Sequence, residues 1–260
     1  MIFFDLLKKL HNLSPLEYAL EYDNTGFQIG YNDKEIKKIC LATDATLNVV
    51  EQAITGEADL LLTHHPLIFE PLKQITSEDI IGRRIIKLIR SDINYLAMHT
   101  NFDVIGMADY AAEIMNLTDP QVLYVTCRNA EKDEGIGRYG GLETPVILKE
   151  CAQNLKQLFN LDTVRVYGDS TKIIRTVAIS PGSSGGVLPH ALKAKADLLI
   201  TGDIKHSMAV EANAHGIALI DAGHHALEKI FVPFMNHYFT RETPEIEVFA
   251  ANEPNPFYTI

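Results

Sequence analysis

Residues 39–63, ICLATDATLNVVEQAITGEADLLLT, and residues 177–201, VAISPGSSGGVLPHALKAKADLLIT, align without a gap at an offset of 138 residues. Each segment has the pattern of an apolar strand, a loop, a helix and a second apolar strand, and each ends in A-D-L-L-[LI]-T. Similarity at one fixed offset over this length is typical of duplication. The sequence therefore predicts an α/β protein with two related halves, each with a mostly parallel sheet. Residues 78–91 and 145–160 have helical periodicity, and the strongest loop signal is residues 131–141, EKDEGIGRYGG.

A second correspondence places INYLAMHTNFD (93–103) over GIALIDAGHHALE (216–228), so that His99 meets His224 and Asp103 meets Glu228. Each half thus has a strand followed by H-x-x-x-[DE], a spacing that puts both side chains on one face of a helix. The first half has His64-His65 where the second has Gly202-Asp203. This divergence favours one composite site over two equal ones.

His64 and His65 end the buried-strand pattern ADLLLTHHP, which Pro66 stops. Ligands bind at the carboxyl ends of strands in open α/β sheets. Imidazole nitrogen and carboxylate oxygen together suit Zn, Fe, Mn, Co or Ni better than Ca or Mg. Five candidate ligands exceed the needs of one tetrahedral ion and predict a dinuclear centre with two divalent transition-metal ions per chain. These ligands are His64, His65, Asp103, His224 and Glu228.

Several of these candidates also have a plainer interpretation. The His64-His65 pair could cap an exposed strand end, and Asp103 could be a helix N-cap or a first-turn acid. His99 could be a core histidine bonded to backbone; otherwise it and His206 are candidates for proton transfer, since the ordinary pKa of histidine suits that task. His225 is expected to face away from the site.

The composition excludes several classes of protein. The formal net charge is −11 with no dense basic patch, which disfavours nucleic acid as a partner. No apolar run approaches the roughly 18 residues of a membrane span. The first segment, MIFFDLLKKLHNL, has the pattern of an amphipathic helix and not of a signal peptide, so we expect a cytoplasmic protein. Three scattered cysteines agree with a reducing compartment and argue against a thiolate metal site.

Phosphate-binding elements are harder to find. The chain has no GxxxxGK[ST] motif. SPGSSGG (180–186) lies between a strand and a helix, and it is either an anion cradle or an ordinary turn. Arg138, in GIGRYGG, is expected to contact a phosphate if its loop reaches the site.

Several motifs occur in an order that resembles one family over nearly the full chain. They are EYDNTGFQIG (with Tyr22 where tryptophan is usual), TDAT, LLLTHHPLIF, HTNFD, GIGRYGGLE, SPGSSGG, LLITGDIKHS (with Ser207 where many relatives have a second histidine) and DAGHHALE. This order resembles the GTP cyclohydrolase I type 2 family, also called the Nif-three-like proteins. The resemblance implies a dinuclear metal centre in the cleft between two interlocked α/β/α domains. Its ligands fall on the same five residues, and the assembly it implies is a homohexamer.

On this basis we expect residues 1–125 with 218–260 to form a first domain that carries most metal ligands, and residues 126–217 to form a second. The resemblance implies a metal-dependent hydrolase in which a metal-bound hydroxide attacks a C–N bond of a purine nucleotide, GTP or a related one, with His99 or His206 moving protons. The alternative is a metal-binding regulator, metal chaperone or scaffold without turnover.

Overall fold

The computed structural model describes residues 1–128, 132–183 and 186–258. The described chain forms two compact units: unit 1 comprises residues 1–102 and 231–258, and unit 2 comprises residues 103–230. The sequence-based boundaries lie elsewhere, after residues 125 and 217. With the observed division, the five predicted ligands are shared between the units, because His64 and His65 belong to unit 1 while Asp103, His224 and Glu228 belong to unit 2.

Unit 1 is built on a five-stranded sheet in the order β1-β4-β3-β2-β11. Only β1 runs antiparallel to its neighbour, so this sheet is mostly parallel, as predicted. The elements of unit 1 are α1 (Phe3–Leu13), η1 (Leu16–Tyr18), β1 (Gly26–Ile29), β2 (Lys38–Ala42), α2 (Leu47–Thr55), β3 (Leu60–Thr63), α3 (Ile80–Arg90), β4 (Asn94–Ala97), α4 (Thr100–Phe102), α10 (Phe231–Glu242) and β11 (Glu247–Ala250).

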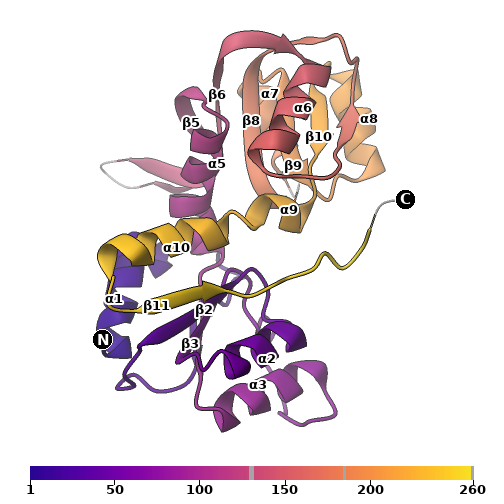
Figure 1. The fold of residues 1–260 in the computed structure, drawn as a ribbon. Helices are drawn as coiled ribbons and strands as arrows, with labels where there is room; N and C mark the ends of the chain where they lie inside the picture. Colours follow the sequence, from indigo (N-terminus) through magenta and orange to yellow (C-terminus); the bar gives the residue numbers. More distant parts are fainter. Residues whose placement is uncertain (129–131, 184–185, 259–260) are drawn as a thin grey trace. The chain divides into compact units, whose positions relative to one another are not determined.

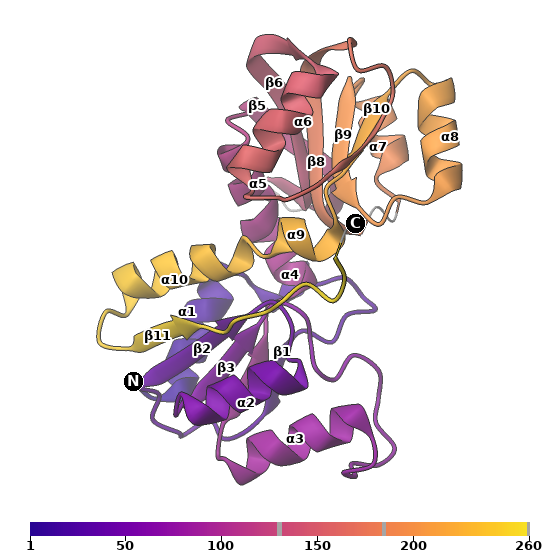
Figure 2. The ribbon, with the colours of Figure 1, turned by 45° about the vertical axis from the view of Figure 1, so that its right-hand side comes forward.

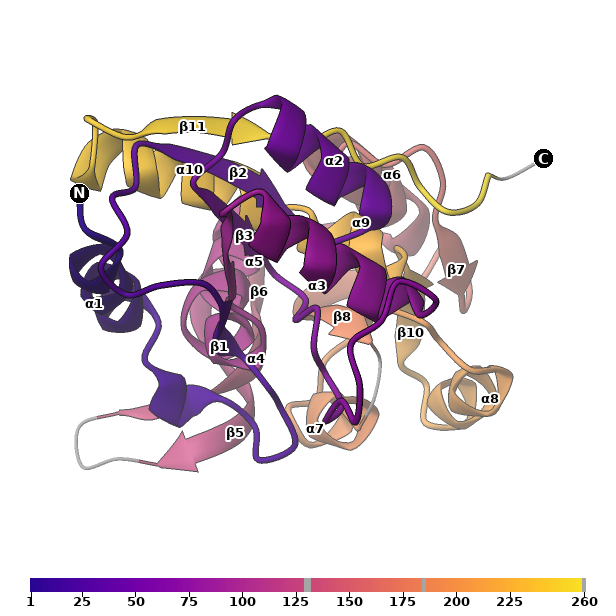
Figure 3. The ribbon, with the colours of Figure 1, turned by 90° about the horizontal axis from the view of Figure 1, so that it is seen from below.

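Helices cover both faces of this sheet. Val49 and Ala53 of α2 and Leu88 of α3 pack with Cys40 and Leu61 of the strands in one apolar cluster. Figure 3 shows α2 and α3 side by side on that face. The helices α1 and α10 also bury their apolar sides, and α10 contacts β2 and β11 (Figure 1). Because both faces are covered, only the strand ends and connecting loops can present polar side chains to a ligand.

Unit 2 is built on a six-stranded sheet in the order β5-β6-β8-β9-β10-β7. Its elements are η2 (Asp103–Met107), α5 (Ala108–Ile114), β5 (Thr118–Arg128), β6 (Asp133–Ile147), α6 (Leu148–Leu158), β7 (Arg165–Tyr167), β8 (Ile173–Ser183), α7 (Leu188–Lys193), β9 (Leu198–Gly202), α8 (His206–Ala214), β10 (Ala218–Asp221) and α9 (His224–Glu228). Helices α7 and α8 contribute to one apolar cluster with β8, β9 and β10, while α6 contacts β6 and β8 (Figure 2).

The prediction of a mostly parallel sheet is wrong for this unit. The pairs β8–β9 and β9–β10 are parallel, but β5–β6, β6–β8 and β10–β7 are antiparallel. The predicted loop at residues 131–141 is also wrong for its described part, because β6 runs through it. A Cβ on Gly135 would meet the carbonyl of Tyr124, and one on Gly140 would meet the carbonyl of Thr118 at 2.7 Å. These glycines therefore serve close strand packing and not a turn.

The two β-α-β segments share one register. Ile39 pairs with Leu60 in unit 1, and Val177 pairs with Leu198 in unit 2, each 138 residues further along. The aspartate of each A-D-L-L motif accepts two successive backbone N–H groups near the start of the preceding strand. Asp59 accepts from residues 37 and 38, and Asp197 accepts from residues 175 and 176. The repeated aspartates thus perform the same local task in both units.

The strands that follow the two β-α-β segments are β4 and β10, and the turns after them differ in length by one residue. Thr63 pairs with Ala97, and Thr201 pairs with Asp221, an offset of 124 residues between Ala97 and Asp221. His99 and His224, however, are 125 residues apart. The extra residue lies in the turn that holds Gly223, whose φ is +86°, a conformation that favours glycine. This turn brings the chain from β10 directly into α9.

Candidate metal centre

His64 and His65 follow β3 directly, at the carboxyl end of this strand in the unit 1 sheet. His64 N donates to Ala42 O and His65 N donates to Thr43 O, so the backbone stays paired past the strand. The buried hydroxyl of Tyr95 donates to His65 O at 2.8 Å and accepts from Leu67 N at 2.8 Å. Burial raises the pKa of Tyr95, which keeps this hydroxyl protonated. The Tyr95 hydroxyl therefore holds the turn that carries the two imidazoles.

His99 joins this pair. The ring centroids lie 4.9 Å apart for His64–His65, 5.3 Å for His64–His99 and 5.5 Å for His65–His99. One ring nitrogen of each lies within 4.8 Å of those of the other two. Three converging imidazoles are more than a capped strand end needs, and Nδ1 of His99 bonds to the carboxylate of Asp23 instead of to backbone.

An oxygen acceptor holds Nδ1 of each of these histidines. His64 Nδ1 lies 2.8 Å from the carbonyl of Met98, and His65 Nδ1 lies 2.9 Å from Asp44 Oδ1. His99 Nδ1 lies 2.7 Å from Asp23 Oδ1. With Nδ1 donating its proton, Nε2 carries the lone pair, which is the usual arrangement of a metal-binding histidine.

Both carboxylate oxygens of Asp23 are bonded to His99 or to the next residue, Thr100. Its second oxygen accepts from Thr100 N at 3.0 Å and from the Thr100 hydroxyl at 2.5 Å. Burial raises the pKa of Asp23, but the hydrogen bonds with His99 and Thr100 and the charge of His99 outweigh burial, and the pKa is lowered. Asp23 therefore stays ionised at neutral pH and favours a proton on His99 Nδ1.

Unit 2 carries the H-x-x-x-E element on α9. His224 Nε2 lies 3.0 Å from Glu228 Oε2, and His224 Nδ1 lies 2.8 Å from Asp203 Oδ2. Both imidazole nitrogens thus face carboxylate oxygens, an arrangement that suits a cation bound beside the ring. The spacing of four residues brings these two side chains together on one face of α9, as expected for a helix.

Two glycines make room for this pair. A Cβ on Gly182 would collide with Glu228 Oε1, and a Cβ on Gly202 would collide with the main-chain nitrogen of His224. Gly182 belongs to the SPGSSGG segment, of which Ser184 and Gly185 lie outside the described residues. Gly182 of this segment thus lies against the carboxyl group of Glu228, which disfavours a phosphate at that position.

Asp103 is not a helix N-cap. The helical stretch begins at Thr100, whose N–H is capped by Asp23, and Asp103 opens the π-helical turn η2. A carboxylate oxygen of Asp103 lies within 4.8 Å of one of Glu228. π-Helical turns occur frequently at functional sites, because they shift the side chains that follow.

Arg138 has a structural task. Its buried guanidinium donates to Asp109 and Glu134 and to the carbonyls of Val104, Gly135 and Gly137. The expectation that Arg138 contacts a phosphate is therefore wrong. Its bond to Val104 instead steadies η2, the turn that carries Asp103.

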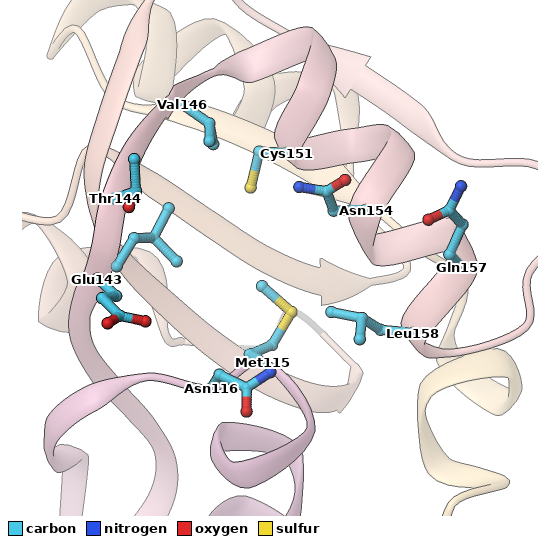
Figure 4. Close-up of a pocket in the computed structure, with 10 residues that line it drawn as sticks. Met115, Asn116, Glu143, Thr144, Val146, Cys151, Asn154, Gln157 and Leu158 are labelled. Carbon is cyan, nitrogen blue, oxygen red and sulfur yellow. The ribbon is translucent and has the colours of Figure 1, made fainter.

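His206 lies exposed at the start of α8 and belongs to none of the potential metal clusters of the described residues. Unit 2 also has a cavity of about 340 Å³ beside α6 and β6 (Figure 4). Met115, Cys151 and three carboxamide side chains contribute to its lining, which has no cationic residue and none of the predicted ligands. The residues that line this cavity therefore belong to none of the potential metal clusters of the described residues.

The residues that orient the histidines are absent from the set predicted from the sequence: Asp23, Asp44, Asp203 and Tyr95. A signal exists for two of them. Asp44 follows β2 and holds the histidine after the neighbouring strand β3, and Asp203 follows β9 and holds the histidine after β10. Each of these pairs is separated by 21 residues. An acid at one strand end and a histidine at the next parallel strand end is a searchable pattern.

The fold and these clusters define an α/β protein with two mixed sheets and histidine and carboxylate groups that could bind metal ions. Along the described ranges, no helix has both the length and the apolar character that a membrane span needs. Residues 1–256 match the model of the family Duf34/NIF3 (NGG1p interacting factor 3), and the chain belongs to this family.

Its relatives include proteins named GTP cyclohydrolase 1 type 2 homolog. The one from Clostridium acetobutylicum is 32% identical over 226 residues, which cover 86% of this chain and 84% of the relative. The one from Lactococcus lactis is 31% identical and is covered over 98% of both chains. Among solved structures, the Staphylococcus aureus protein SA1388 aligns with a TM-score of 0.90 and 29% identity over 100% of this chain and 99% of that one.

Proposed function

We propose that this protein is a metal-dependent hydrolase of the GTP cyclohydrolase 1 type 2 kind. The observation that carries the proposal is the hydrogen bonding of the four imidazoles that follow the strand ends. Nδ1 of His64, His65, His99 and His224 each meets an oxygen acceptor between 2.7 and 2.9 Å away. Such partners fix the ring orientation and raise the basicity of Nε2 toward a metal.

The donor groups fit transition metals and not calcium or magnesium. Unit 1 offers imidazoles, and unit 2 offers His224 with the carboxylates of Asp103 and Glu228. Mixed nitrogen and oxygen donors suit Zn, Fe, Mn, Co or Ni. The ligand set in the proposal is His64, His65, Asp103, His224 and Glu228.

We further propose that the two groups of ligands serve one centre of two ions. Neither group alone has enough donors for two ions. The support for a shared centre is the family resemblance, which assigns all five ligands to one dinuclear site. When bound, two such ions would acidify coordinated water and so supply a nucleophile at neutral pH.

In this proposal the protein's own side chains orient the metal ligands and move protons. Asp44 and Asp203 hold two of the ligand imidazoles in the required tautomer. His99, backed by the ionised Asp23, accepts and returns a proton at Nε2. His206 remains a candidate for a second proton carrier at the exposed start of α8. His206→Gln tests that role, which is wrong if the variant keeps the rate and pH profile of the wild type.

The proposed substrate is a purine nucleotide, GTP or a close relative, and the proposed reaction is hydrolysis of a C–N bond. The support is the name that the relatives carry. Neither Arg138 nor the described part of the SPGSSGG segment supports the binding of its phosphates. We also propose a homo-oligomer, a hexamer by family resemblance, which light scattering on the native protein measures directly.

The deciding experiment incubates protein reconstituted with iron, zinc, manganese, cobalt or nickel with GTP and measures formate. Formate release that is lost in Glu228→Gln and in His65→Gln supports the hydrolase. Tight metal binding with no formate from GTP or other purine nucleotides contradicts it. Ready transfer of metal to an apo-enzyme would then identify a metal-handling protein without turnover.

A further inference from the structure

The segment that follows β11 is bonded along the neighbouring strand β2. Ala251 N donates to Leu41 O at 2.8 Å. Asn252 and Gln52 then exchange two bonds, of 2.8 Å from Asn252 N and 2.9 Å to Asn252 O. These contacts set the register of the segment, so that Glu253 reaches the carboxyl end of β2. All of them lie within unit 1.

The Glu253 carboxylate bridges two successive backbone N–H groups there. Thr43 N donates to Glu253 Oε2 at 2.6 Å, and Asp44 N donates to Glu253 Oε1 at 2.8 Å. Hydrogen bonds to an ionised carboxylate are about twice as strong as neutral ones. The loop between β2 and α2 is therefore held by a residue that lies 210 positions away from Thr43 in the sequence.

Asp44 transmits this hold to the candidate centre. Its side chain is 42% exposed, so burial does little to immobilise it, yet its Oδ1 lies 2.9 Å from His65 Nδ1. The position of the Asp44 main chain then decides whether its carboxylate meets the imidazole. Glu253 fixes that main chain on one side, while the pairing of His65 N with Thr43 O fixes it on the other.

We propose that Glu253 is a positioning residue of the metal centre, acting through Asp44 on His65. This inference rests on the proposed function, because it assigns a role toward a metal bound by His65. The C-terminal segment is thereby part of the site's support and more than an edge of the sheet.

Glu253→Gln tests the role with little change of shape. The amide oxygen of the introduced side chain accepts one N–H, but its NH₂ group faces the other, so one of the two bonds is lost. Glu247→Gln is the matched control. Glu247 lies in β11 of the same segment, forms an exposed ion pair with Lys38 at 2.8 Å and belongs to none of the potential metal clusters of the described residues. Asp44→Asn and the double variant Asp44→Asn/Glu253→Gln complete the set.

The measurement titrates the full-length apo-protein with Co²⁺ in competition with a chelator and records the visible d–d spectrum, beside the thermal unfolding of each apo-protein. Loss of partners around metal ligands typically costs 10–100-fold in affinity, and we expect about a tenfold loss in Glu253→Gln with an altered spectrum. We expect no loss in Glu247→Gln, and the double variant should bind no more weakly than Asp44→Asn.

Any of three results overturns the inference alone. Two of them are wild-type affinity and spectrum in Glu253→Gln, and losses in Asp44→Asn and Glu253→Gln that multiply in the double variant. Equal losses of affinity in Glu247→Gln and Glu253→Gln, in step with lower apo-protein stability, also overturn it. Wild-type protein that binds no Co²⁺ overturns the proposed function as well.

Discussion

The carboxylate of Asp203 lies 2.8 Å from Nδ1 of His224, on the side of the ring opposite to Glu228. The carboxylate of Asp44 contacts Nδ1 of His65 in the same way. In both pairs the histidine follows the aspartate by 21 residues. A buried β-α-β scaffold places an acid after one strand and a histidine after the next. The acid favours the tautomer with its proton on Nδ1, which leaves the lone pair on Nε2.

The pairing of Asp203 with His224 leads to a first prediction. Asp203→Asn removes the charge that favours a proton on Nδ1, so the metal affinity should fall by roughly 10–100-fold. Metal competition against a chelator measures the loss. Asp162→Asn, at an exposed aspartate outside the potential metal clusters of the described residues, is the control and should bind metal like the wild type. Equal affinities in the two variants would show that Asp203 has no influence on His224.

Gly182 supplies a second prediction. Its φ is +84°, and an added Cβ would collide with Glu228 Oε1. Gly186 has a similar φ of +79°, but a Cβ added to it would meet no atom within 4 Å. Gly186→Ala should cost about 1–2 kcal/mol of unfolding free energy from the left-handed conformation alone. Gly182→Ala should cost more and should also lower the metal content, because Glu228 must move.

Urea unfolding and metal analysis of both variants check this. If Gly182→Ala retains its metal and is no less stable than Gly186→Ala, the close approach of Gly182 to Glu228 is not required for the site.

The buried thiol of Cys151 gives a third prediction, on pH. Burial raises its pKa from 9.0 to about 11. A folded-state pKa above the unfolded value means that the native protein keeps a proton that the unfolded chain releases. The thiol's contribution to stability is therefore complete below pH 9 and is lost as the pH rises to about 11. The unfolding free energy should fall less steeply between about pH 8 and about pH 10.5 in Cys151→Ala than in the wild type. Equal slopes would contradict the shift.

The β-α-β segments and their strand-end histidines could be predicted from the sequence, because both depend on local patterns. Apolar runs of strand length ending in Thr63 and Thr201 recur with one register, and H-x-x-x-E has its meaning on any short helix. The His224–Glu228 pair could be predicted for that reason.

Other features depend on contacts between distant parts of the chain. Asp23 meets His99 across 76 residues, and Glu253 meets Thr43 across 210. No periodicity links such positions. Arg138 was misassigned because a guanidinium in a glycine-rich segment is equally suited to a phosphate and to the buried carbonyls and acids that it contacts. The glycines around it indicated a loop, although strand β6 needs them for close backbone approach.

The most direct test of the account is the transition-metal content per chain of native protein, beside that of Glu228→Ala. Glu228 is 3% exposed and lies 3.0 Å from His224, so its removal takes one ligand and the partner of another. We expect close to two ions per chain in the wild type and a sharp fall in the variant. Little or no metal in the wild type, even after anaerobic reconstitution with iron, zinc or manganese, would contradict it.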